Sequence, residues 1–180
     1  MTRAIGDAGH MKAYQGKNGS ITLWLSLVLG AALLSGCFSK KPPEPPKPAK
    51  LELAVVAATD LNPDATGRAS PLVVRIYALR SLTEFEKADF FALYEKDEQI
   101  LAADLAKREE FVLKPGETIT QAREYTPDVQ FIAVMGAYRD VERSTWRAST
   151  KIAEGANGVL SLKADQKALS VSIEDEAAKD

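Results

Sequence analysis

Cysteine and histidine are nearly absent from this chain of 180 residues, which has one of each, Cys37 and His10. With a single cysteine, no disulfide can form within the chain. Beyond residue 37 there is neither residue type, so this part lacks the usual nitrogen and sulfur ligands of zinc and the base of a Ser-His-Asp or Cys-His nucleophile. The glycines form no GxGxxG or P-loop spacing. We therefore predict no catalytic residue, no metal ligand and no cofactor.

An excess of charge of one sign is also missing. The 23 Lys and Arg and the 25 Asp and Glu give a formal net charge of −2, and the two signs are mixed along the chain. This balance argues against nucleic acid as a partner. Glu109 and Glu110 are adjacent in an expected strand, so their side chains should point to opposite faces, which does not suit paired acid–base catalysis. We expect neither an enzyme nor a small-molecule substrate.

The chain has one long hydrophobic run, Ile21 to Leu34. As a helix it would span about 21 Å at about 1.5 Å per residue, which is short of a hydrocarbon core of about 30 Å. Lys12 and Lys17 precede the run, and small residues separate it from Cys37, as in a secretory signal peptide. The stretch before Met11 is atypical of such a peptide, so we expect translation to begin at Met11.

The run ends in Leu34-Ser35-Gly36-Cys37, which resembles the bacterial lipobox. In a lipobox the cysteine receives diacylglycerol and becomes the first residue after cleavage. We therefore predict a lipoprotein signal peptide over residues 1–36 and a lipidated Cys37. One alternative is an ordinary secretory signal followed by a free cysteine. The other is an anchor that is not cleaved. Two or more acyl chains would anchor the chain stably, because each buried CH₂ contributes about 0.8 kcal/mol.

Residues 37–50 are rich in proline and lysine and cannot bury a core. This composition favours polyproline II, which rises about 3.1 Å per residue, so the proline-rich segment would reach roughly 40 Å. We predict a tether between Cys37 and a folded domain. Its prolines are Pro42, Pro43, Pro45, Pro46 and Pro48.

Residues 51–173 contain short segments with the apolar alternation of β-strands. Leu51 and Val55 would share one face of the first strand, whereas Val129 to Tyr138 is apolar on both faces and predicts a central, covered strand. Residues 81–105 change to helical spacing. A mainly β fold, a β-sandwich with a short helical insert, follows from this order. The expected strands cover residues 51–57, 72–79, 109–113, 118–125, 129–138, 144–152, 159–163 and 168–173.

Local signals predict where several elements begin and end. Ser81-Leu82-Thr83-Glu84 is a capping-box pattern that should start a short helix, and Asp89 can cap a second. Pro115-Gly116 suits a type II turn, and Asn157-Gly158 suits a hairpin turn. The acidic stretch from Glu174 to Asp180 predicts a disordered tail.

The connection from Thr59 to Pro71 is the expected segment with the strongest functional indication. At about 13 residues it is long for a link between two strands of a compact domain, and long loops often carry function. Asn62-Pro63-Asp64 favours a turn within it. A surface excursion without a role is the alternative.

These features together resemble the TssJ family, the outer-membrane lipoproteins of the type VI secretion system. The resemblance covers nearly all of residues 51–173. It implies a transthyretin-like two-layer β-sandwich with added helices and a non-catalytic role. The segments that carry it are the lipobox at Cys37, the block Ser70 to Leu79, Phe85, Ala88 to Tyr94, Glu109 to Gly116, and the pairs Tyr138-Arg139 and Trp146-Arg147.

The resemblance also implies a partner and a contact surface. The partner would be the periplasmic C-terminal domain of the inner-membrane protein TssM, within a complex that crosses the cell envelope. In that family the loop between the first two strands contacts the partner, and this loop corresponds here to Thr59 to Pro71. The expected contact residues are Leu61, Asn62, Pro63 and Asp64.

The residue after Cys37 is Phe38, not the aspartate that retains lipoproteins at the inner membrane of enterobacteria. We therefore expect the protein to be lipid-anchored in the outer membrane and to face the periplasm.

The alternative function is a lipoprotein that binds a small ligand or a glycan within its sandwich. That function predicts a concave pocket lined by aromatic residues such as Tyr77, Tyr94 and Trp146.

Overall fold

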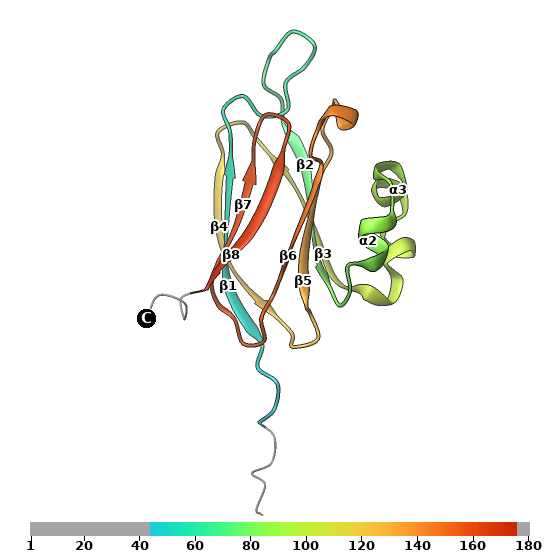
Figure 1. Cartoon of the computed structure of the whole chain (residues 1–180). Coiled ribbons are helices and arrows are strands. Elements are labelled where there is room, and N and C mark those ends of the chain that lie inside the picture. The colour runs from blue at the N-terminus through green and yellow to red at the C-terminus, as the bar shows by residue number, and fades with distance from the viewer. Residues whose placement is uncertain (1–43, 176–180) are drawn as a thin grey trace, which may run out of the picture. The chain divides into compact units, whose positions relative to one another are not determined.

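The computed structural model describes residues 44–175, which form two four-stranded sheets packed face to face, with a helical layer outside one of them (Figure 1). The predicted mainly β, two-layer sandwich is confirmed. Its strands are β1 (Ala49–Ala57), β2 (Leu72–Leu79), β3 (Leu105–Leu113), β4 (Thr118–Tyr125), β5 (Phe131–Gly136), β6 (Arg147–Lys151), β7 (Asn157–Ala164) and β8 (Leu169–Asp175). Its helices are α2 (Thr83–Lys87), α3 (Phe90–Leu101) and the short 3₁₀ turns η1 (Ala102–Asp104) and η2 (Val141–Arg143).

The first sheet has the order β4-β1-β7-β8, with β1 antiparallel to β4 and parallel to β7. Alternation along β1 decides which face meets the core. Leu53 and Val55 are buried, whereas Glu52 and Val56 on the other face are exposed to solvent. This sheet therefore has one apolar face, as its sequence pattern predicts.

The second sheet has the order β3-β2-β5-β6, and its two central strands are covered on both faces. Val74 and Ile132 pack toward the first sheet, whereas Tyr77, Leu79 and Met135 pack against the helical layer. Double coverage explains why β2 and β5 are almost continuously apolar. The prediction of a central, covered strand at β5 is confirmed.

The helical layer begins differently from its predicted capping box. α2 has Leu82 as its N-cap, without a side-chain hydrogen bond, and the Ser81 hydroxyl instead accepts a bond of 3.2 Å from the Thr83 N–H. The prediction for the second helix is confirmed, because the Asp89 carboxylate accepts a bond of 2.9 Å from the Ala92 N–H. Both helices are held to the sheet by apolar side chains, including the fully buried Phe85 and Leu93.

Helix α3 is kinked at Lys96, whose φ of −139° and ψ of 30° are not helical. Arg75 of β2 binds the helix at this break, since its Nη1 donates to the carbonyls of Leu93 at 3.3 Å and Tyr94 at 2.8 Å. A kink frees carbonyl groups from their partners within the helix, and a guanidinium at the end of a helical segment satisfies them. Arg75 thus caps the first half of α3 from the sheet.

Arg75 also belongs to a charged cluster between the sheet and α3, which we call the ionic clasp. The Asp97 carboxylate of α3 accepts bonds from Arg75 at 3.1 Å, Arg108 at 2.7 Å and the Tyr77 hydroxyl at 3.0 Å. Glu110 accepts from the same two arginines, at 2.6 Å and 2.8 Å. Hydrogen-bonded pairing of this kind allows charges to be buried under a helix.

The predicted turn at Asn157-Gly158 is wrong. These residues begin β7, where Asn157 pairs with Lys50 of β1, and the turn lies earlier, with the Ala156 N–H bonded to the Ala153 carbonyl at 3.1 Å. Gly155 supplies the positive φ, 66°, that this turn needs. Parallel pairing with β1 therefore outweighs the local preference for a turn.

The two ends of the domain differ slightly from the predicted boundaries. β1 begins at Ala49, within the expected tether, and β8 continues through Glu174 and Asp175, which were expected to belong to a disordered tail. Glu174 pairs with Val159 of β7, so this part of the tail prediction is wrong. The predicted signal peptide, Cys37 and residues 176–180 lie outside the described residues.

Candidate functional site

The β1–β2 connection, residues 58–71, projects beyond the strands at one end of the sandwich, opposite the end where β1 begins (Figure 1). Two other connections lie beside it: residues 137–146, which contain η2, and the β7–β8 turn, residues 165–168. The Thr145 N–H donates to the Lys167 carbonyl at 2.8 Å, which joins these two connections to each other. We call residues 58–71, 137–146 and 165–168 together the loop end.

Asn62 joins all three parts of the loop end. Its N–H donates to the Gln166 carbonyl at 3.1 Å, and its side-chain Nδ2 donates to the Pro71 carbonyl at 2.8 Å. Its Oδ1 accepts a bond of 2.9 Å from the Arg139 N–H. Asn62 has a φ of 46°, a conformation that asparagine tolerates better than most residues. With the fully buried Leu61 beside it, Asn62 fixes the base of the β1–β2 loop.

The tip of the loop is ordered by Asp64. Its Oδ1 accepts bonds from the Thr66 hydroxyl at 2.6 Å, the Thr66 N–H at 2.9 Å and the Arg68 N–H at 3.1 Å. The bonds from Thr66 and Arg68 lower the pKa of the Asp64 carboxyl from 3.8 to about 2, so this group is charged at neutral pH. Gly67, with a φ of 83°, completes the turn. The tip residues 65–68 are exposed.

A hollow of about 530 Å³ lies between the loop and its two neighbours. We call it the loop-end groove. Asp140 is paired there with Lys167, whose Nζ lies 2.9 Å from its carboxylate. The lining residues are Pro63, Asp64, Ala65, Arg139, Asp140 and Lys167.

Comparison with protein families identifies the chain. A family model described as type VI secretion lipoprotein (VasD, EvfM, TssJ) matches residues 49–175, which is more than half of the sequence. The chain belongs to this family. A search of curated protein sequences gives no match.

Solved structures agree with the family assignment. The type VI secretion lipoprotein TssJ1 from Pseudomonas aeruginosa is 32% identical, with a TM-score of 0.68, and the match covers 72% of this chain and 98% of that one. Lip from Serratia marcescens, a membrane-bound component of the type VI secretion system, is 25% identical, with a TM-score of 0.64 over 72% and 99% of the two chains. A chain of a type VI membrane complex is 25% identical, with a TM-score of 0.62 over 69% and 98%.

The four contact residues expected in this type VI secretion lipoprotein occupy two different environments. Pro63 and Asp64 are partly exposed and line the loop-end groove. Leu61 and Asn62 are buried, with 0% and 4% of their surfaces exposed. Direct contact by the latter two side chains does not fit this structure, because reaching a partner would require them to leave the core and break the loop base. In this structure the two residues hold the base of the loop in place through burial and hydrogen bonds.

The loop end contains surface residues that sequence reasoning did not select. Ala65 to Arg68 form the exposed tip, and Arg139, Asp140 and Lys167 line the groove from elsewhere in the chain. Glycine in a turn-forming stretch is a sequence signal for the tip. Arg139 follows Asn62 by 77 positions, and no local pattern links the two residues.

The aromatic residues proposed to line a ligand pocket in this lipoprotein pack against other side chains. Tyr77 is fully buried with its ring centroid 5.8 Å from that of Phe85, and Tyr94 stacks on Phe90 at 5.7 Å. Trp146 meets Phe90 edge to face at 5.3 Å. Four of the best-formed surface hollows in residues 44–175 are not lined by Tyr77, Tyr94 or Trp146. The structure thus gives no support to a ligand pocket at these three residues.

Residues 44–175 of this lipoprotein have neither a metal-binding cluster nor a membrane-spanning helix. This part of the chain contains no group of three or more His, Cys, Asp and Glu side chains that could hold a metal ion. No helix within it is both long enough and apolar enough to cross a membrane.

Glu109 and Glu110 point to opposite faces of β3, as predicted, since Glu109 bonds Arg123 of β4 at 2.8 Å and Glu110 belongs to the ionic clasp.

Proposed function

We propose that this type VI secretion lipoprotein binds the periplasmic C-terminal domain of TssM through the β1–β2 loop, and that it has no catalytic activity. The protein would hold the secretion complex at the outer membrane by means of a lipid anchor on Cys37. Its contribution to assembly is a folded surface at the end of a tether.

The projecting and internally ordered loop is the observation that carries the proposal. Its base is fixed by Leu61 and Asn62, and its tip by Asp64, so the exposed residues 65–68 have a defined conformation before any partner arrives. Binding by an ordered loop loses less conformational entropy than binding by a disordered one.

The positions of the start of β1 and of the loop end, at opposite ends of the sandwich, are consistent with a tethered binding module. β1 begins at one end of the sandwich and the loop end lies at the other, so the chain that leads from Cys37 joins the domain far from the proposed contact surface (Figure 1). A lipid anchor can therefore hold one end of the domain while the other end remains open to a periplasmic partner.

A steric substitution at the loop tip tests the proposal. Ala65 is exposed, and its side chain has no polar group, so Ala65→Trp should leave the loop intact while blocking close approach. We expect this change to weaken binding of the TssM domain by about tenfold or more, equal to about 1.4 kcal/mol. Isothermal titration of the full-length protein in detergent with the purified TssM domain measures it.

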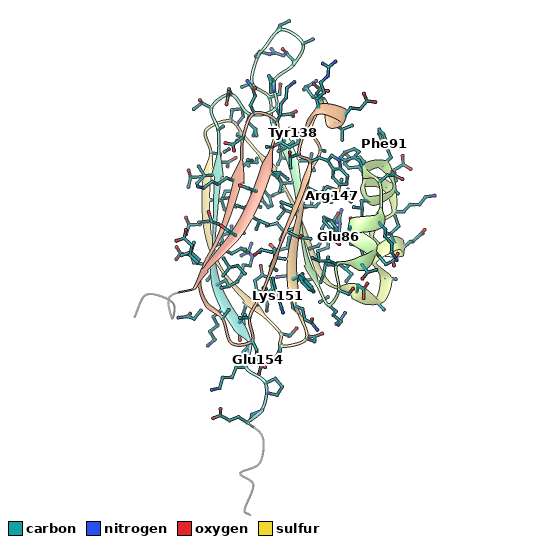
Figure 2. The ribbon with its side chains drawn as sticks, in the orientation of Figure 1. Glu86, Phe91, Tyr138, Arg147, Lys151 and Glu154 are labelled. Carbon is teal, nitrogen blue, oxygen red and sulfur yellow. The ribbon has the colours of Figure 1, made fainter. Side chains whose placement is uncertain are left out.

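Ala153→Trp is the matched control, because Ala153 is an exposed alanine in the β6–β7 connection at the opposite end of the sandwich, next to Glu154 (Figure 2). We expect its affinity to equal that of the wild type. If the wild-type protein does not bind the TssM domain, the proposal that this domain is the partner is refuted. Equal affinities of wild type and Ala65→Trp would refute the loop as the contact.

A further inference from the structure

We propose that the loop-end groove receives an acidic side chain of the protein partner and that Arg139 pairs with its carboxylate. This inference rests on the proposed function and specifies the chemistry of the contact. In addition to the projecting loop, the contact would include the connection between β5 and η2, which contributes the positive charge of Arg139.

Among the cations around the groove, Arg139 is the one that has no ion pair within residues 44–175. Asp140 is matched by Lys167 at 2.9 Å, and Asp64 is matched by Arg68 at 3.2 Å. Among residues 44–175, no carboxylate lies within 4.0 Å of the Arg139 guanidinium. The two acidic groups of the groove are therefore neutralised within the protein, whereas Arg139 is available to an incoming anion.

The backbone that carries Arg139 is fixed on both sides. The Arg139 N–H donates to the Asn62 side chain, and the preceding residue, Tyr138, is buried and donates its hydroxyl proton to the Asp165 carbonyl at 3.0 Å. Figure 2 shows Tyr138 inside the sandwich near the loop end. Only the exposed side chain of Arg139 would need to become ordered on binding. Because Asn62 also fixes the loop base, the arginine and the loop keep a set spacing.

Arginine suits a carboxylate partner for geometric reasons. Its planar guanidinium can donate two parallel N–H bonds to the two oxygens of one carboxylate, which a lysine ammonium cannot do. The groove has the room to admit a side chain, at about 530 Å³, and Pro63 and Ala65 give it an apolar wall for the aliphatic part of that side chain. An aspartate or glutamate at a turn or strand end of the partner fits this description.

A membrane surface fits the groove less well than a protein. Attraction to anionic lipid needs a cluster of several basic residues. At the loop end, the four cations Arg68, Arg139, Arg143 and Lys167 lie among five carboxylates, those of Asp60, Asp64, Asp140, Glu142 and Asp165, so this surface has no cluster of unbalanced positive charge. One arginine in a groove matches one carboxylate of a folded partner.

Substitution of Arg139 tests the inference by titration of the full-length protein in detergent with the TssM domain. We expect Arg139→Glu to weaken binding by about tenfold or more, and Arg139→Lys to lose about threefold to fivefold because it keeps the charge but not the paired donors. The affinity of the Arg139→Glu variant should also vary less with salt concentration than that of the wild type. Arg143→Glu is the control, since Arg143 is a largely exposed arginine at the same end, and its effect should be within about twofold.

The outcomes separate this inference from the proposed function. If the wild type binds the TssM domain and Arg139→Glu binds equally well, the role of Arg139 is refuted while the loop contact stands. If Arg143→Glu weakens binding as much as Arg139→Glu, a general charge effect replaces the specific pair. If Arg139→Glu instead loses adsorption to vesicles containing phosphatidylglycerol and keeps its partner affinity, a lipid is the ligand. A wild type that does not bind the TssM domain refutes both proposals.

Discussion

Cys37→Ser is expected to move the protein from the membrane fraction to the soluble fraction while leaving its affinity for the TssM domain unchanged. A serine cannot form the thioether that carries diacylglycerol, so the acyl chains that hold the protein in the bilayer are lost. Each buried CH₂ contributes about 0.8 kcal/mol, so losing whole acyl chains removes essentially all attachment. Fractionation of the envelope followed by titration of the soluble protein measures both parts of the prediction.

Ser39→Ala is the matched control, because it changes a nearby hydroxyl and keeps the lipobox. Its protein should remain in the membrane fraction. Membrane retention of Cys37→Ser would show that another segment anchors the chain. A loss of partner affinity in the soluble Cys37→Ser protein would show that the lipid, and not only the folded domain, takes part in binding.

Asp97→Ala is expected to destabilise the domain by about 3 kcal/mol. The change removes the acceptor shared by Arg75, Arg108 and the Tyr77 hydroxyl, all of which lie under or beside α3. The Asp97 and Arg75 side chains are only 10% and 11% exposed, so water cannot replace the lost partner freely. Breaking one side of such a pair costs about 3–5 kcal/mol in comparable buried sites. Urea unfolding of the soluble Cys37→Ser protein, with and without Asp97→Ala, measures it.

Asp128→Ala provides the comparison for an exposed ion pair. Asp128 bonds Arg80 at 2.7 Å, but the two side chains are 47% and 43% exposed. Its loss should cost less than about 1 kcal/mol. Equal costs for Asp97→Ala and Asp128→Ala would contradict the view that the ionic clasp fastens α3 to the sheet.

The contribution of Asp97 should also depend on pH. Burial disfavours its charged form, but hydrogen bonds from Arg108 and Tyr77 and the charges of both arginines hold the pKa of Asp97 below its ordinary value of 3.8. Since the folded state has the lower pKa, the stabilisation is complete above about pH 4 and is lost as the pH falls through the folded-state pKa. The difference between wild type and Asp97→Ala should therefore shrink in acid.

The strands of this domain were largely predictable because each has one covered face or two. Apolar and polar residues alternate along β1, and β5 is continuously apolar, so the local sequence of each strand predicts which of its faces are buried. The parallel pairing of β1 with β7 was not predictable, because it joins residues more than 100 positions apart, such as Lys50 and Asn157. That pairing is also the reason why the turn signal at Asn157-Gly158 failed.

The candidate site was predictable only in its position along the chain. The length of the β1–β2 connection pointed to the loop, but the expected contacts included Leu61 and Asn62, which are buried. A turn-forming asparagine has the same sequence appearance whether its side chain faces solvent or bonds a distant backbone. The placement of Arg139 beside the loop follows from such a bond and required the fold.

Hydrogen exchange of the full-length protein, with and without the TssM domain, tests the central claim most directly. The account predicts that new protection is confined to the loop end, above all to residues 58–71 and 137–146, where exchange of exposed amides is fast in the free protein. Residues of α3 and of the outer face of β1 and β4 should exchange at unchanged rates. Protection of α3 or of the first sheet, with residues 58–71 unchanged, would contradict the account.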